Sequence, residues 1–180
     1  MTTPKIYVIA EDHWDRNAIN KQQVKLAMYG VEYLYHELVN ADYGMFKGRL
    51  LSFSRQQVID MLDDPNKQYI GNDNLIDPRF NQDIFELVKE APTLKRLCGF
   101  DLLFSDPTYQ KNPGIHPQQL RENRMLEILT TSVIPHAEKG AICCIACGRD
   151  HLRTTSPKQM GGKSPLRAYI DQNKRLFKFI

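Results

Sequence analysis

The chain has 180 residues, a formal net charge of +3 and an apolar content of 42%, ordinary values for a globular protein. This length predicts one α/β domain spanning residues 1–180, with enough chain for one hydrophobic core. Lysines and arginines are dispersed, so we expect no nucleic-acid partner. We also expect no membrane association and a cytoplasmic location, because no apolar run approaches membrane-spanning length and the first residues lack a secretory-signal pattern.

The first part of the chain predicts a β-α-β unit. Residues 5–10 are a short apolar, β-branched run, as expected of a strand buried on both faces. A helix is expected over residues 16–29, and residues 31–38 then alternate as a second strand. Ser54 and Gln57 have the spacing of a capping box, which predicts that another helix begins there.

The middle of the chain contains two segments without periodicity. Residues 40–53 carry two turn-marking glycines, and residues 69–81 are rich in asparagine, aspartate and glycine, so both are expected to be irregular. A helix is expected over residues 81–91, where Pro92 stops it. A third strand is expected over residues 95–103.

The last part continues the alternation of helices and strands. After a loop over residues 106–115, Pro117 suits the first position of a helix reaching residue 133. Residues 141–147 predict a fourth strand, a short helix opens at Ser164, and residues 174–180 predict a final edge strand. The order of elements predicts an α/β fold with a single layer of mostly parallel sheet flanked by helices.

Two of the predicted strands end in similar polar sequences. The first is followed by Glu11 and His13, and the fourth by a Gly-x-x-His sequence that ends at His151. In open α/β sheets, ligands bind beyond the carboxyl ends of the strands. Either histidine alone is more simply explained as a strand cap or a solvated side chain. Their equivalent positions, taken together, predict one shared polar site.

Other charged residues are candidates for the same site. Alternation places Glu37 on the face of Val31 and the two strand tyrosines, where a carboxylate is costly unless paired, so a site residue and an ordinary salt bridge are equally consistent. Asp101 lies inside an apolar strand. Arg121 and Arg124, on the following helix, are candidate partners for Asp101 or for an anionic substrate, or are both solvated.

The four cysteines are Cys98, Cys143, Cys144 and Cys147. Three crowd one predicted strand, whereas a disulfide framework would spread them over loops, so reduced thiols are expected. Cys144 and Cys147 form a Cys-x-x-Cys sequence, but at this spacing in a strand they point to opposite faces. We expect Cys143 and Cys144 in the core, whereas Cys147 is next to Gly148 and so is close enough in the sequence to approach the site.

The polar motifs at the strand ends and on the helix after Pro117 resemble those of a known protein superfamily. Residues 10–13, Ala-Glu-Asp-His, resemble the motif Gly-Glu-x-His, and residues 148–151, Gly-Arg-Asp-His, resemble a closing Gly-x-x-His; the other matches are Glu37 at a strand end, Gly-Phe-Asp at 99–101, and Arg121, Arg124 and Met125 on a helix. The chain therefore resembles the EreA/ChaN-like superfamily. That superfamily includes erythromycin esterase-like hydrolases, TIKI/TraB proteins and ChaN-like haem-uptake proteins.

The resemblance implies a hydrolase that activates water against an ester or amide of a small molecule or peptide. His13 would be the general base, oriented by Glu11, and Glu37 would position the water or His13. His151 and Arg124 would stabilise developing negative charge.

A metal-dependent version, of the TIKI peptidase type, is also implied, and would hold Zn, Mn or Co. Its ligand set comprises Glu11, His13, Glu37 and His151. In both versions Asp101 and Arg121 support the site.

The alternative is a non-enzymatic protein that binds a ligand or haem, or a bacterial effector delivered into a host cell and recognised by a host protein. An aromatic pocket would then be lined by Trp14, Tyr33, Tyr35, Tyr43 and Met45. The chain departs from the family pattern where Ala10 replaces the motif glycine, where Trp14 adds a bulky ring beside His13, and in its shortness. These departures leave open whether it is an enzyme, and on which substrate.

Overall fold

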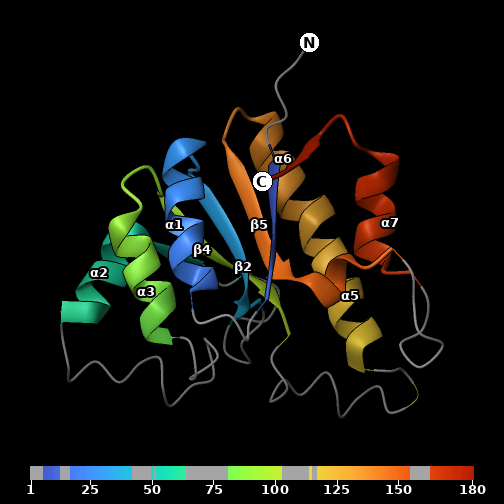
Figure 1. The fold of residues 1–180 in the computed structure, drawn as a ribbon, viewed down its shortest axis with the longest axis horizontal. Coiled ribbons are helices and arrows are strands. Elements are labelled where there is room, and N and C mark those ends of the chain that lie inside the picture. The colour runs from blue at the N-terminus through green and yellow to red at the C-terminus, as the bar shows by residue number, and fades with distance from the viewer. Residues whose placement is uncertain are drawn as a thin grey trace.

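The computed structural model describes residues 6–12, 17–41, 50, 52–63, 81–102, 114, 117–154 and 163–180. Within these segments the chain forms a six-stranded sheet with helices on both faces (Figure 1). No helix in them is long and apolar enough to cross a membrane.

The strands and helices follow the predicted alternation. The strands are β1 (Ile6–Glu11), β2 (Tyr33–Asn40), β3 (Ser52–Ser54), β4 (Arg96–Asp101), β5 (Cys143–Gly148) and β6 (Phe177–Phe179). The helices are α1 (Ala18–Met28), α2 (Arg55–Asp63), α3 (Asn81–Glu90), α5 (Pro117–Ile128), α6 (Ile134–Glu138) and α7 (Pro165–Gln172). A π-helical segment, Leu129–Val133, joins α5 to α6, and a 3₁₀ turn, Arg149–Leu152, follows β5.

The sheet has the strand order β3-β4-β2-β5-β1-β6. All neighbouring strands are parallel except β3, which is antiparallel to β4. Helices α1, α2 and α3 pack on one face, and α5, α6 and α7 pack on the other (Figure 1). The predicted α/β fold, a mostly parallel sheet flanked by helices, is therefore confirmed.

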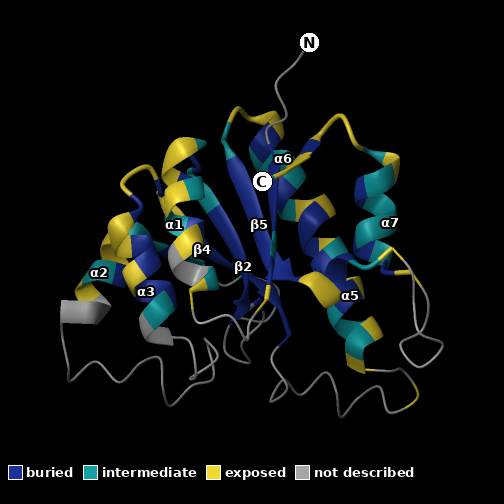
Figure 2. Cartoon of the chain, in the orientation of Figure 1, coloured by how far each residue is buried: buried dark blue, intermediate teal, exposed yellow. Residues whose placement is uncertain are grey.

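The central strands are buried on both faces because helices cover both (Figure 2). Successive residues of β5 alternate between the two apolar clusters, so Cys143 and Cys147 face α5 while Cys144 faces α1. All four thiols are free and buried, which confirms the expectation of reduced cysteines. Cys147 lies in the apolar core, where burial raises the pKa of its thiol well above the ordinary value.

The predicted capping box is present at the start of α2. The Gln57 N–H donates to Ser54 Oγ at 3.2 Å, and the Ser54 N–H donates to Gln57 Oε1 at 2.8 Å. Ser164 likewise caps α7 by accepting from the Arg167 N–H at 3.3 Å, with Pro165 in the first turn. Both helix starts are encoded locally, which explains why they are visible in the sequence.

Three expectations were wrong in detail. Residues 52–54 were expected to be irregular but form β3, because pairing with β4 stabilises a strand too short to show a pattern. Strand β2 begins at Tyr33, so Val31 packs on the α1 face rather than beside Glu37. The helix from Pro117 was expected to end at residue 133 but continues through the π-helical segment into α6, where Pro135 occupies the first turn.

Candidate functional site

A cavity of about 280 Å³ lies at the carboxyl ends of the central strands. Its described lining comes from the ends of β1, β2 and β5, the residue after β1, helix α5 and the turn after β5: Glu11, Asp12, Glu37, Gln118, Arg121, Gly148, Arg149, Asp150 and His151. Strands β2 and β5 are neighbours in the sheet. After β2 the chain continues to β3 and β4 on one side of this pair, and after β5 it continues to β6 on the other side. The cavity therefore lies at a topological switch point, the usual place for a ligand in such sheets.

Glu37 is the centre of the polar wall of this cavity. It is 4% exposed, and it lies where the pairing of β2 with β4 shifts register, just beyond the last β2–β5 pair. Glu37 Oε1 accepts from Arg121 Nη2 at 2.8 Å and lies 3.1 Å from His151 Nε2. The Gly148 N–H donates to Glu37 Oε2. Glu37 thereby ties β2 to both α5 and the end of β5.

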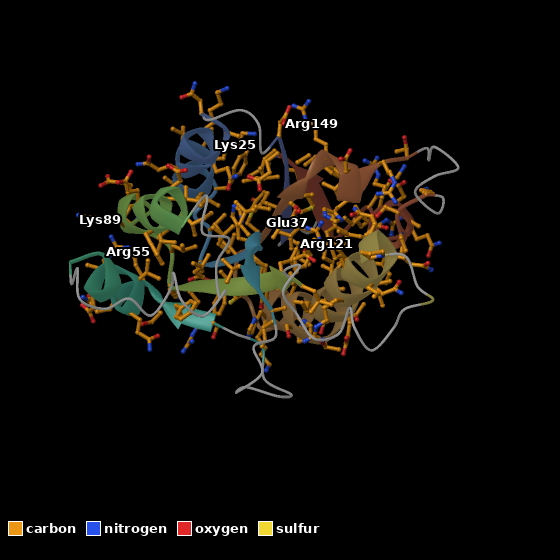
Figure 3. All side chains as sticks on the ribbon, turned by 90° about the horizontal axis from the view of Figure 1, so that it is seen from below. Lys25, Glu37, Arg55, Lys89, Arg121 and Arg149 are labelled. Carbon is orange, nitrogen blue, oxygen red and sulfur yellow. The ribbon has the colours of Figure 1, made fainter. Side chains whose placement is uncertain are left out.

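Arg121 also binds Asp101, at the end of β4. Arg121 Nε donates to Asp101 Oδ2 at 2.7 Å, and Nη2 donates to the same oxygen. Burial raises the pKa of the fully buried Asp101 to about 6, and the Arg121 guanidinium opposes that rise. Figure 3 views the site from below and shows Glu37 and Arg121 together near its middle. The predicted pairing of Asp101 with an arginine of this helix is present.

His151 lies between two carboxylates. Its Nε2 faces Glu37, while its Nδ1 lies 3.6 Å from Glu122 Oε1 and 2.9 Å from the Gln118 amide nitrogen. Desolvation disfavours the charged ring, but Glu37 and Glu122 outweigh it and raise the pKa of His151 to about 9. The imidazole is therefore protonated near neutral pH. In that state it stabilises negative charge and cannot accept a proton from water.

The backbone of His151 is hydrogen-bonded as well as its ring. Ser164 Oγ donates to the His151 carbonyl at 2.5 Å and, as described, caps α7. The start of α7 is thereby joined directly to the 3₁₀ turn that carries the imidazole.

Glu122 and Arg153 extend the network, although neither was predicted to be part of the site. Arg153 Nη1 donates to Glu122 Oε1 at 2.6 Å. Burial alone would raise the pKa of Glu122, but hydrogen bonds from His151, Arg153 and Gln118 outweigh it and lower that pKa. The sequence did contain a signal, because Glu122 shares the buried stripe of α5 with Met125.

Together these residues form a line of alternating charge, which we call the charge chain. Its members are Arg153, Glu122, His151, Glu37, Arg121 and Asp101, in that order. Each internal member has opposite charges on both sides, which offsets the cost of burying it.

Glu11 reaches the cavity from the other face of the sheet. Gln22 Nε2 donates to Glu11 Oε2, and His36 Nε2 lies 3.8 Å from Glu11 Oε1. The Leu38 N–H donates to His36 Nδ1 at 3.1 Å, which places the ring proton on Nε2, facing Glu11. Gln22 and His36 were not predicted as site residues, although a histidine inside an apolar strand was a visible signal.

The remaining predicted residues are placed as follows. Arg124 pairs with Glu127 at 2.7 Å and is absent from the described lining of the cavity. Tyr35 is fully buried and its hydroxyl lies 2.5 Å from His136 Nδ1, while Tyr33 stacks on the same ring, so neither tyrosine lines the cavity. Cys147 does not line it either. His13, Trp14, Tyr43 and Met45 lie outside the described residues.

Glu37, Asp101 and His151 together have the composition of a metal site. Each of the three offers one ligand atom, and these atoms lie within 4.8 Å of one another. However, Arg121 bonds to both carboxylates, and His151 Nε2 faces the same oxygen of Glu37. The described residues therefore do not fit a metal ion while the guanidinium is in place.

Comparison with known proteins bears on the fold. Neither the protein-family models nor the curated protein sequences compared with the chain match it. Among solved structures, the chain is similar to one described as cofacial haem binding to ChaN of Campylobacter jejuni, with 12% identity, a TM-score of 0.54, and coverage of 98% of this chain and 80% of that one.

The fold is ChaN-like. This confirms the ChaN branch of the predicted resemblance at the level of architecture. Likeness to the erythromycin esterase and TIKI/TraB branches remains a prediction. The cavity of this chain lies at the carboxyl-end edge of the sheet, where the sequence motifs predicted a polar site.

Proposed function

We propose that the protein binds a small ligand in the cavity at the carboxyl ends of β1, β2 and β5. The observation that carries the proposal is this cavity of about 280 Å³ at the switch point, whose lining includes three members of the charge chain, Glu37, Arg121 and His151. Buried ion pairs hold Glu37, Arg121 and His151 in fixed positions before a ligand arrives. Such preorganised polar groups are what a small-molecule site needs for orientation and specificity.

Haem is the first ligand to test, because the structurally similar ChaN protein is described as binding it. Arg149 is exposed on the cavity lining and suits a carboxylate of such a ligand. His151 is the one imidazole in the described lining, and both of its ring nitrogens face protein partners. The described residues therefore fit the carboxylates of haem and supply no ligand for its iron.

A pair of titrations tests this proposal. The protein would be titrated with haem and with iron-free protoporphyrin, following the Soret band. We expect saturable binding of both at similar affinity, because the described contacts involve the carboxylates and not the iron. Arg149→Gln is expected to weaken both about tenfold, as for loss of one charge-assisted hydrogen bond.

The matched control is Arg175→Gln. Arg175 is also exposed but precedes β6, at the opposite end of the sheet from the cavity, so its loss should leave both affinities unchanged. Absence of saturable binding, or equal effects of the two substitutions, would contradict binding at this cavity.

A second function, hydrolysis of an ester or amide, is favoured by the protonated state of His151. An imidazolium on a cavity wall stabilises the oxyanion that forms when water attacks a carbonyl. Glu37 keeps the ring oriented, and Arg121 in turn holds Glu37. Clusters of buried groups with shifted pKa values are typical of active sites. The general base expected for this reaction, His13, lies outside the described residues.

This second function is tested with chromogenic esters. His151→Gln is expected to lower kcat by about 10²–10³-fold, as for loss of an oxyanion-stabilising group. His136→Gln is the matched control, because His136 lies on α6 against Tyr35 and does not line the cavity. Circular dichroism checks that both variants fold. A wild-type protein without esterase or amidase activity would exclude this reading and leave ligand binding in place.

A further inference from the structure

Arg121 holds together two carboxylates that would otherwise repel each other. Its side chain is 15% exposed, against 0% for Asp101 and 4% for Glu37. Its Nη2 lies 2.8 Å from Glu37 Oε1 and also bonds Asp101 Oδ2, while Nε donates to the same Asp101 oxygen at 2.7 Å. The Arg121 cation offsets their repulsion, because like charges in a buried site are strongly unfavourable.

The same carboxylates, with His151, are also a metal-ligand set. Two carboxylates and an imidazole suit Zn²⁺ or Mn²⁺, and their ligand atoms lie within 4.8 Å of one another. An ion bound to all three would lie among the atoms that now contact the Arg121 nitrogens. The guanidinium and the ion therefore compete for one position.

We infer that Arg121 is a built-in cation that takes the place of a divalent metal ion, and that removing its guanidinium opens a metal site made by Glu37, Asp101 and His151. This inference does not depend on which ligand enters the cavity. Arg121 then supplies the positive charge that balances Glu37 and Asp101, as a metal ion does in a site of this composition.

The test is the binding of Mn²⁺ alone to Arg121→Ala, followed by the electron paramagnetic resonance signal of free Mn²⁺. We expect one ion to bind about 100-fold more tightly than to the wild type, because a cation at the same position no longer repels it. Adding Asp101→Asn should abolish this binding. Arg121→Lys keeps a positive charge and should bind no better than the wild type.

Arg153→Ala is the matched control for losing an arginine from the charge chain. This substitution removes the arginine bound to Glu122 and leaves Arg121 between Glu37 and Asp101, so it should not create Mn²⁺ binding. Stoichiometric Mn²⁺ binding by the wild type that is lost in Asp101→Asn would overturn the inference.

Folding of Arg121→Ala supplies an independent measurement. Two buried carboxylates without their cation destabilise this variant, so Mn²⁺ should raise its Tm while leaving the Tm of the wild type unchanged. A folded variant that binds Mn²⁺ no better than the wild type would refute the inference. So would a variant that stays unfolded at saturating Mn²⁺, because the ion would then have failed to replace the guanidinium.

Discussion

The protonated state of His151 makes the stability of the protein depend on pH. Its pKa in the folded chain is about 9, against 6.5 for an unperturbed histidine. Because the folded value is the higher, the stabilisation is fully present below about pH 6.5 and is lost as the pH rises through about 9. At about 1.4 kcal/mol for each pKa unit, the loss is about 3 kcal/mol in the free energy of unfolding.

Urea unfolding at about pH 7 and about pH 9.5 measures the total pH dependence. The four buried cysteines also contribute to it, because burial raises the pKa of their thiols above that of an unfolded cysteine. Asp101 does not contribute in this window, because its raised pKa of about 6 places its titration below it. His151→Gln lacks the titrating ring but keeps the cysteines, so it should lose about 2 kcal/mol less than the wild type over this window, which begins above the unfolded histidine pKa. Equal pH dependence in the two proteins would refute the placement of His151 between two ionised carboxylates.

Three further predictions concern other parts of the structure. Ser54→Ala removes the side-chain cap of α2 and should lower the free energy of unfolding by about 1 kcal/mol, measured in urea. Glu122→Gln removes a carboxylate beside His151 and should lower the pKa of that ring, followed by an NMR titration of its protons; an unchanged pKa would contradict the 3.6 Å contact. Ile145→Ala, in fully buried β5, should cost about 2–5 kcal/mol, while Val24→Ala on the exposed side of α1 should stay within about 0.5 kcal/mol by the same assay.

The elements that the sequence predicted well are those encoded by local pattern. The apolar run at 141–147 became β5, and the polar pair Ser54 and Gln57 opened α2, because burial on both faces and capping each leave a signature within a few residues. The strand Ser52–Ser54 left none, since a three-residue strand exists only through its pairing with β4.

The site residues also divide into those with a local signal in the sequence and those that depend on distant contacts. Glu37, Asp101 and His151 were predicted as site residues because strand ends and a charge inside an apolar strand can be recognised in the sequence, and Arg121 and Arg124 were both named as partners. The choice between Arg121 and Arg124 was not predicted, since it depends on which turn of α5 faces the strand ends. Arg153 was missed because its partner is supplied by a distant helix, which no spacing along the chain reveals.

The bond from Ser164 to the carbonyl of His151 has a consequence for the last part of the molecule. Helix α7 begins just after Ser164. Strand β6 then pairs with β1, and the Ile180 N–H donates to the Val8 carbonyl at 3.1 Å. The final segment therefore connects the turn that carries His151, on the lining of the cavity, to strand β1. Removal of residues 164–180 would therefore take away both the hydrogen bond to the His151 carbonyl and the strand that pairs with β1.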